Sequence, residues 1–285
     1  MGAFAEGPFL SPSKNGIHKL AVLRSPTNGI ADLEECYGPS NVDSTTSSIA
    51  LFNQAPEQPG ALDAIRGLKK RGFKVAIGHS AATYEQAREA VNAGATMITH
   101  LFNAMEPLHH RNPGIFGLLG TQSIPPIKKP YFGIIADGIH VHPTAINIAW
   151  NAHPAGFILV TDAMHLVGLP DGIYDWTNGD RIIKKGSLLK LEGTDKIAGS
   201  SITLLECVNN FLKWSSVSIA EALGAVTSTP ARMLDLTARK GVLSPGADAD
   251  LVILDETKDE VGSTQLKLAQ VWKFGQCVFK ETVDS

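Results

Sequence analysis

The chain has 285 residues, of which 44 % are hydrophobic and 19 % charged, and a formal net charge of −3 at pH 7. This composition is that of a globular protein with one large domain, or one large and one small domain, and it excludes a disordered or fibrous chain. Lys and Arg form no dense run, so the sequence does not indicate a nucleic-acid partner.

Short apolar segments alternate with amphipathic segments in the first part of the chain. We predict buried strands at residues 49–52, 73–78, 95–99, 131–136 and 157–161, and helices at residues 62–71 and 83–93. Thr83 is a suitable N-cap for the second helix because Gln86 follows three residues later, and Gly94 is a natural stop. Strands that alternate with helices indicate a parallel sheet, either doubly wound or closed into a barrel.

Polar residues follow nearly every one of these strands. They are His79, His100, Asp137 with His140, and Asp162, and Glu6 follows a further short segment at residues 2–5. Barrels take their catalytic groups from the C-terminal ends of many strands, whereas a doubly wound sheet concentrates them at one switch point. No GxGxxG motif follows a strand. The sequence therefore favours an α/β fold of the (β/α)8 TIM-type barrel class.

The pattern changes after Asp162. Residues 172–199 are rich in Gly, Asp and Lys and predict small antiparallel strands. Helices are predicted at residues 201–214 and 219–236, and a strand and a closing hairpin at residues 241–254 and 271–279. We therefore divide the chain into a barrel domain, residues 1–165 and 200–240, and part of a small β-sandwich domain, residues 166–199 and 241–285.

Two of the strand-end histidines suggest a metal site. His79 and His100 are one strand–helix unit apart, so neighbouring strands of a barrel would direct both imidazoles into the same mouth. A carboxylate from Glu6 would complete a two-histidine, one-carboxylate set that suits catalytic zinc. Asp162 could then act as the general base. The alternative is that each histidine only ends a strand and that Asp162 is a helix N-cap.

A polar loop at residues 107–114 contains Arg111 between two histidines and a Pro-Gly pair. A guanidinium group on the rim of a barrel can bind a phosphate through paired hydrogen bonds. The alternative is an exposed basic cluster that is only solvated.

Cysteine content and the N-terminal residues bear on the compartment. Cys36, Cys207 and Cys277 are few and far apart, which favours a reducing environment over a disulfide framework. Residues 1–12 have neither the basic start nor the apolar segment of a signal peptide, and no apolar run approaches the length of a membrane span. We expect a cytoplasmic protein without a membrane partner.

Several segments together resemble the N-acetylglucosamine-6-phosphate deacetylases of the amidohydrolase superfamily. They are Ile-Gly-His-Ser at residues 77–80, Thr-His-Leu-Phe-Asn-Ala-Met at 99–105, His-His-Arg-Asn-Pro-Gly at 109–114, Ile-Ala-Asp-Gly at 135–138, Leu-Val-Thr-Asp-Ala at 159–163 and Gly-Ala-Asp-Ala-Asp at 246–250. Their order and spacing are more specific than any one of them. The resemblance extends over nearly the whole chain, beginning at Glu6.

The resemblance implies a barrel beside a small β-sandwich and one divalent metal ion, zinc or iron, held by Glu6, His79 and His100. It implies that Asp162 is catalytic and that the reaction releases acetate from N-acetyl-D-glucosamine 6-phosphate, giving glucosamine 6-phosphate in amino-sugar catabolism. Contacts to this phosphorylated amino sugar are implied for His18, Asn103, Ala104, Arg111, His140, Ile197, Ala198 and Gly199. Arg111 would reach the phosphate of a neighbouring subunit, which implies a homodimer.

The chain departs from the family's pattern at its beginning. Family members have a His two residues before the metal-binding Glu, where this chain has Phe4. They also have a long preceding segment with half of the sandwich and the first two barrel strands, so we expect an incomplete barrel here. Two other functions stay open: a catalytically inactive homologue that only binds its ligand, and an amidohydrolase that acts on a cyclic amide.

Overall fold

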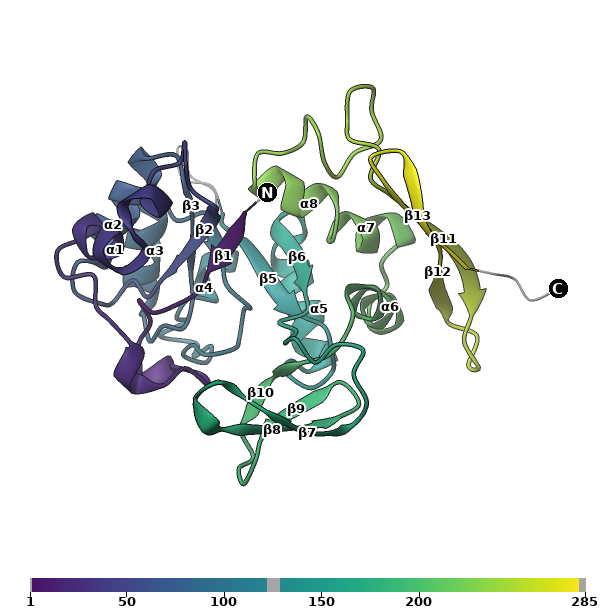
Figure 1. Ribbon diagram of the computed structural model, residues 1–285, viewed down its shortest axis with the longest axis horizontal. Helices are drawn as coiled ribbons and strands as arrows, with labels where there is room; N and C mark the ends of the chain where they lie inside the picture. The colour runs from purple at the N-terminus through teal and green to yellow at the C-terminus, as the bar shows by residue number, and fades with distance from the viewer. Residues whose placement is uncertain (1, 122–128, 282–285) are drawn as a thin grey trace.

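A six-stranded parallel sheet forms the centre of the molecule (Figure 1). The computed structural model describes residues 2–121 and 129–281. The strands lie side by side in the order in which they occur in the chain. They are β1 (Ala3–Ala5), β2 (Ile49–Gln54), β3 (Lys74–Ile77), β4 (Met97–Ile98), β5 (Tyr131–Ile135) and β6 (Phe157–Val160).

Helices connect the strands and cover the outer face of the sheet (Figure 1). They are α1 (Ile30–Tyr37), α2 (Ala61–Lys70), α3 (Tyr84–Ala93), α4 (Gly117–Gly120) and α5 (Pro143–Ala152). Helix α2 shows why these segments are helical: Ala61, Ala64, Ile65 and Leu68 are buried at a spacing of three and four residues. The main core lies between these helices and the sheet, where phenylalanines from β2, β5 and β6 pack.

The predicted boundaries of α3 are confirmed. The Thr83 side chain accepts a hydrogen bond from the Gln86 amide, and the Gln86 side chain returns one to the Thr83 backbone. Gly94 ends the helix at φ +132°, a conformation that is costly for residues with a side chain. The cap therefore sets the start of α3, the helix that connects His79 to β4.

The sheet is curved but does not close within the described residues. β1 pairs with β2 at one end, and β6 pairs with β5 at the other. Beyond β6, the Leu159 N–H donates to the Ala225 carbonyl at 3.1 Å. A second apolar cluster lies on the concave side and includes Met97 and Ile158. The prediction of an incomplete parallel α/β barrel is therefore confirmed.

The C-terminal half adds two antiparallel sheets and a helical layer. The four-stranded sheet contains β7 (Gly172–Asp175), β8 (Arg181–Lys185), β9 (Leu188–Leu191) and β10 (Ile197–Ser200). The helices are α6 (Leu204–Trp214), α7 (Ile219–Gly224) and α8 (Ser228–Met233), and the last sheet contains β11 (Leu251–Lys258), β12 (Thr264–Lys273) and β13 (Gln276–Lys280). The segment predicted as helical at 219–236 is thus divided, because Pro230 has no N–H with which to continue α7.

The two antiparallel sheets are separate and lie on different sides of the large sheet (Figure 1). The sheet of β7–β10 adjoins the C-terminal end of β6 through a bridge between Ala163 and Ser200. The sheet of β11–β13 instead packs on α6, where Asn209 exchanges two hydrogen bonds with the Leu266 backbone. We predicted both segments within one sandwich domain, and that division into domains stays a prediction. Within the described ranges, every helix is too short or too polar to cross a membrane.

Candidate active site

A cavity of about 700 Å³ opens at the C-terminal ends of the parallel strands. Its wall combines strand-end residues, the loop after β1 and the edge strand β10. Eleven of the residues predicted from the sequence line it: Glu6, His18, His79, His100, Asn103, Ala104, His140, Asp162, Ile197, Ala198 and Gly199. Arg111 is the exception. Phe4, which replaces the family's usual His, lies on β1 with 40 % of its surface exposed and does not line the cavity.

Three strand-end residues in this wall have an unusual backbone. His79 and Asp162 have φ +49° and His100 has φ +23°, values that non-glycine residues rarely adopt. Each such residue costs on the order of 1–3 kcal/mol and persists only where surrounding contacts hold it. Backbone strain of this kind is concentrated at functional sites in proteins, and here it occurs at two of the three predicted metal ligands and at the predicted base.

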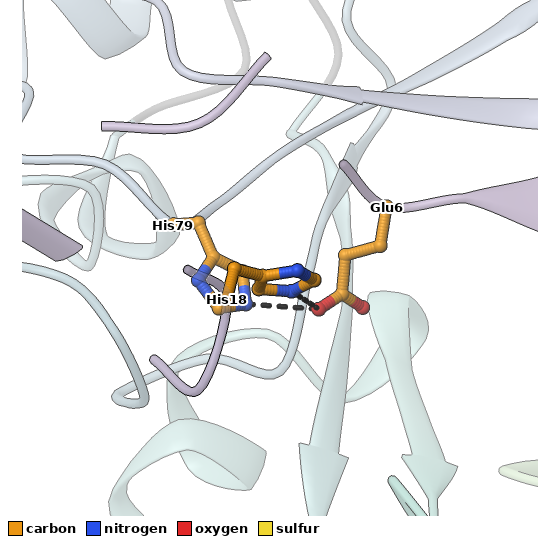
Figure 2. A group of neighbouring side chains, drawn as sticks. All are labelled: Glu6, His18 and His79. Atoms are coloured by element: carbon orange, nitrogen blue, oxygen red, sulfur yellow. Dashed lines mark hydrogen bonds and ion pairs between the residues drawn. The ribbon is translucent and has the colours of Figure 1, made fainter. Parts of the chain in front are cut away.

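Glu6, His79 and His100 converge on one point. Glu6 Oε1 lies 2.9 Å from His79 Nε2 and 3.7 Å from His100 Nε2, and the two Nε2 atoms are 3.0 Å apart. Metal–ligand bonds of about 2.0–2.1 Å in a tetrahedral zinc site separate the donor atoms by about 3.3 Å. Figure 2 shows the Glu6 carboxylate, at the end of β1, directed toward the imidazole of His79.

Hydrogen bonding shows that this cluster needs a cation. His79 Nδ1 lies 2.7 Å from the Lys14 carbonyl oxygen, which can only accept, so Nδ1 carries the proton. In a neutral imidazole, Nε2 then has a lone pair that faces the Glu6 carboxylate at 2.9 Å. Two acceptors at this distance repel each other unless a proton or a metal ion lies between them. A backbone carbonyl that fixes the tautomer in this way is typical of metal-binding histidines, so the residues fit a divalent metal ion.

The charge states of the cluster agree with this. Burial works against ionisation of Glu6, but hydrogen bonds with His100, His18 and His79 outweigh it and hold the pKa of the carboxyl far below its usual range. Burial also opposes protonation of His100, but the contact with Glu6 leaves its pKa above the usual value. The carboxylate therefore stays ionised and attracts positive charge.

His18 is a further donor at the same point. Its Nε2 lies 3.7 Å from Glu6 Oε1 (Figure 2), and the ligand atoms of Glu6, His18 and His79 all lie within 4.8 Å of one another. His18 comes from the loop after β1, and its ring packs edge-on against that of His79. The structure thus brings His18, predicted as a substrate contact, as near to the carboxylate as His100.

Asp162 follows β6 and is exposed in the cavity wall. Its carbonyl accepts a hydrogen bond from the Ser200 N–H at 3.2 Å, and the Ser200 carbonyl accepts one from the Met164 N–H at 2.8 Å. These two bonds attach β10 to the residues around Asp162. They explain how Ile197, Ala198 and Gly199 come to line the same cavity.

His140 is oriented by a neighbouring carboxylate. Asp137 accepts hydrogen bonds from His140 Nδ1 at 2.6 Å and from the backbone N–H groups of Ile139 and His140 at 2.8 and 2.9 Å. Burial opposes ionisation of Asp137, but these bonds outweigh it and lower the pKa of its carboxyl. The ionised carboxylate fixes the imidazole, which leaves Nε2 as the ring nitrogen available to a ligand.

The remaining predicted residues divide into two groups. Asn103 and Ala104 lie in a tight turn after His100, where the Ala104 carbonyl accepts from the Ser80 N–H at 3.0 Å. Arg111 lies in an exposed loop, where its Nη1 is 2.8 Å from His110 Nε2. The structure therefore brings Asn103 and Ala104 to the cavity of their own chain but not Arg111.

Sequence reasoning missed part of the cavity wall. The Lys14 carbonyl was not predicted because any residue can supply a backbone carbonyl, so it has no signature in the sequence. Trp176, which stacks on His165 with 5.6 Å between ring centres, and Lys196 line the cavity from the four-stranded sheet. An aromatic residue in a Gly- and Asp-rich segment was the available signal for Trp176.

Comparisons with known proteins identify the family. The Amidohydrolase family model matches residues 1–279. The chain is 45 % identical to the N-acetylglucosamine-6-phosphate deacetylase of Danio rerio and 41 % identical to that of Homo sapiens, over 96 % of its own length in both cases. It is 36 % identical to the N-acetylgalactosamine-6-phosphate deacetylase of Escherichia coli O157:H7 over 97 % of its length, which is 67 % of that protein.

Solved structures give the same relationship. A Mycobacterium smegmatis N-acetyl-D-glucosamine-6-phosphate deacetylase mutant, in complex with N-acetyl-D-glucosamine-6-phosphate, superposes with a TM-score of 0.81 at 32 % identity. The match covers 97 % of this chain and 68 % of the other. The Thermotoga maritima N-acetylglucosamine-6-phosphate deacetylase gives a TM-score of 0.80 at 28 % identity, with 98 % and 70 % covered.

The chain is shorter than these relatives. It spans 66 % of the length of the Danio rerio protein and 65 % of the Homo sapiens protein. The family model nevertheless extends over almost all of the chain, and the resemblance to the deacetylases is confirmed by both sequence and structure. The chain therefore belongs to the amidohydrolase family, as a homologue of the N-acetylglucosamine-6-phosphate deacetylases.

Proposed function

We propose that this protein removes the acetyl group from N-acetyl-D-glucosamine 6-phosphate by metal-dependent hydrolysis. The observation that carries the proposal is the convergence of Glu6, His79 and His100 at one end of a cavity that Asp162 also lines. The named activities of the relatives that are 41–45 % identical supply the substrate.

The residues of the chain can be given distinct roles. Glu6, His79 and His100 would hold one divalent ion, with zinc or iron suited to this donor set. Such an ion supplies Lewis-acid chemistry: it polarises a carbonyl and acidifies water. Asp162 accepts a proton from the attacking water and returns it to the amide nitrogen as the C–N bond breaks, which yields acetate and the free amine.

The other cavity residues would hold the sugar. His140, oriented by Asp137, presents Nε2 to a hydroxyl or carbonyl oxygen, and His18, Asn103 and Ala104 line the same space. Ile197, Ala198 and Gly199 offer the backbone of β10. Arg111 lies outside the cavity, which supports its proposed action on the phosphate bound by the second subunit of a homodimer.

The test is acetate release from N-acetyl-D-glucosamine 6-phosphate by the purified 285-residue chain, with metal content measured on the same sample. We expect turnover with about one metal ion per chain, and slower turnover of N-acetyl-D-galactosamine 6-phosphate. His79→Ala and His100→Ala should both lose the metal, because each removes one of the three proposed ligands and the incomplete set binds a divalent ion weakly.

His142→Ala is the matched control. His142 is an exposed histidine that caps α5 and does not line the cavity, so the variant should keep its metal. Retention of the metal by His79→Ala would contradict the ligand set. Tight binding of the phosphorylated sugar without acetate release would instead identify an inactive binding protein.

A further inference from the structure

A buried polar group lies beneath the metal-binding cluster and has no role in the proposed chemistry. Asn53, in β2, is 0 % exposed. Its Nδ2 donates to the Gly78 carbonyl at 3.0 Å, and its Oδ1 accepts from the Thr99 hydroxyl at 2.7 Å. Thr99 is also buried. These bonds connect β2 to the ends of β3 and β4.

The two partners of Asn53 immediately precede the two histidines. The Gly78 carbonyl belongs to the peptide bond that leads into His79, and Thr99 is followed by His100. The backbone pairing of β3 with β4 ends at this level, with the Thr99 N–H donating to the Ile77 carbonyl at 2.9 Å. Beyond that bond, the Asn53 side chain replaces backbone pairing as the connection between the two strand ends.

The strands also approach closely at this position. A Cβ atom on Gly78 would lie 2.6 Å from Thr99 Cβ and 3.3 Å from Asn53 Oδ1. The backbone then turns sharply on both strands, because His79 and His100 both have positive φ. Small differences in the position of either strand end would therefore change the distance between the two Nε2 atoms.

Other contacts hold each histidine separately. The His79 carbonyl accepts from the Ser11 N–H at 2.8 Å, and its ring is held by Lys14. Next to His100, the Leu101 N–H donates to the Gly133 carbonyl at 2.8 Å. Asn53 differs from these contacts because one side chain connects both strand ends.

We propose that Asn53 is a positioning residue that sets the spacing of His79 and His100 for the metal ion. The proposal rests on the proposed function only in requiring that these histidines bind a metal. Outer hydrogen-bond partners of metal ligands typically change affinity about 10- to 100-fold when they are removed. Removal of the Asn53 amide should weaken metal affinity by a factor in this range, although all three proposed ligands remain.

The experiment measures zinc affinity of the full chain by competition with a chelator, together with the thermal midpoint in excess EDTA. Asn53→Leu removes both hydrogen bonds, and Thr99→Val removes the hydroxyl while it keeps the shape of the side chain. Both should bind zinc about 10- to 100-fold more weakly. Thr99→Ser keeps the hydroxyl and should bind zinc nearly as tightly as the unaltered chain.

Asn147→Leu separates positioning from stability. Asn147, in α5, makes the same pair of contacts far from the cluster: its Nδ2 donates to the Trp214 carbonyl at 2.8 Å and its Oδ1 accepts from the Ser215 hydroxyl. This variant should lower the thermal midpoint and leave zinc affinity unchanged.

The outcomes distinguish this inference from the proposed function. Unchanged zinc affinity in Asn53→Leu, or equal losses in Asn53→Leu and Asn147→Leu, would overturn the positioning role. Zinc binding by the unaltered chain without acetate release would contradict the proposed function alone. Absence of zinc binding by the unaltered chain would contradict both.

Discussion

Asp162 is held more firmly by its backbone than by its side chain. Its carbonyl accepts a hydrogen bond from the Ser200 N–H and its φ is +49°, while its carboxylate is exposed to the cavity. Asp162→Asn should therefore keep the fold and the metal, because asparagine tolerates this backbone region. It should lower kcat by about 10²- to 10⁴-fold, the usual contribution of a general base.

The measurement for Asp162→Asn is single-substrate kinetics with metal content determined on the same preparation. Loss of turnover together with loss of metal would show that Asp162 is needed for metal binding rather than for proton transfer. Unchanged kcat would remove Asp162 from the mechanism.

Individual reactive residues were predictable because each one interrupts an apolar pattern. His79, His100 and Asp162 all follow buried strands, and the structure places all three at one cavity. Asn53 was not predicted because the apolar run that predicts this strand ends at Phe52, one residue before it. Nothing in the sequence distinguishes an asparagine that connects two strand ends from one that is solvated.

The contact between β10 and the Asp162 segment also depends on a glycine. Gly199 has φ +128°, and an added Cβ would lie 3.0 Å from Met164 Cγ and 3.3 Å from the Asp162 carbonyl oxygen. Gly199→Ala should therefore move β10 away from Asp162. We expect a loss of stability of about 1–3 kcal/mol from the strained backbone and a fall in kcat/KM.

Gly193→Ala is the matched variant for this prediction. Gly193 has φ +74° and lies between β9 and β10, but an added Cβ would meet no atom within 4 Å. It should cost about 1–2 kcal/mol of stability, because a side chain disfavours the left-handed backbone region, and it should leave kcat/KM unchanged. Urea unfolding and steady-state kinetics measure both quantities. Equal kinetic effects in the two variants would mean that the position of β10 does not affect the site.

Among the elements, the parallel strands were easier to predict than their surroundings. Continuous apolar runs between helices identify buried strands, and β3, β4, β5 and β6 all lie within the predicted segments. The arrangement of the two antiparallel sheets could not be read in the same way. Alternation of polar and apolar residues along a strand shows that one face of the sheet is covered, but it does not show which part of the molecule covers that face.

At the scale of the molecule, the proposed metal ligands come from one side of the open sheet. Glu6, His79 and His100 follow β1, β3 and β4; β3 pairs directly with β4, and β2 connects β1 to β3. The cluster therefore forms without any contact across the gap between β1 and β6. This explains how the described residues can bring the proposed donor set together while the sheet stays open.

Arg111 is exposed and does not line the cavity of its own chain. If Arg111 reaches the phosphate in a partner's cavity, Arg111→Ala should lower kcat/KM for the phosphorylated sugar by about 10- to 100-fold, the value of a charged hydrogen bond. Mixing Arg111→Ala with Asp162→Asn should then restore activity, because in a mixed dimer the cavity with Asp162 receives Arg111 from the other subunit. The assay compares the mixture with each variant alone at the same total concentration, below KM. Activity equal to the sum of the separate variants would show that Arg111 does not act across subunits.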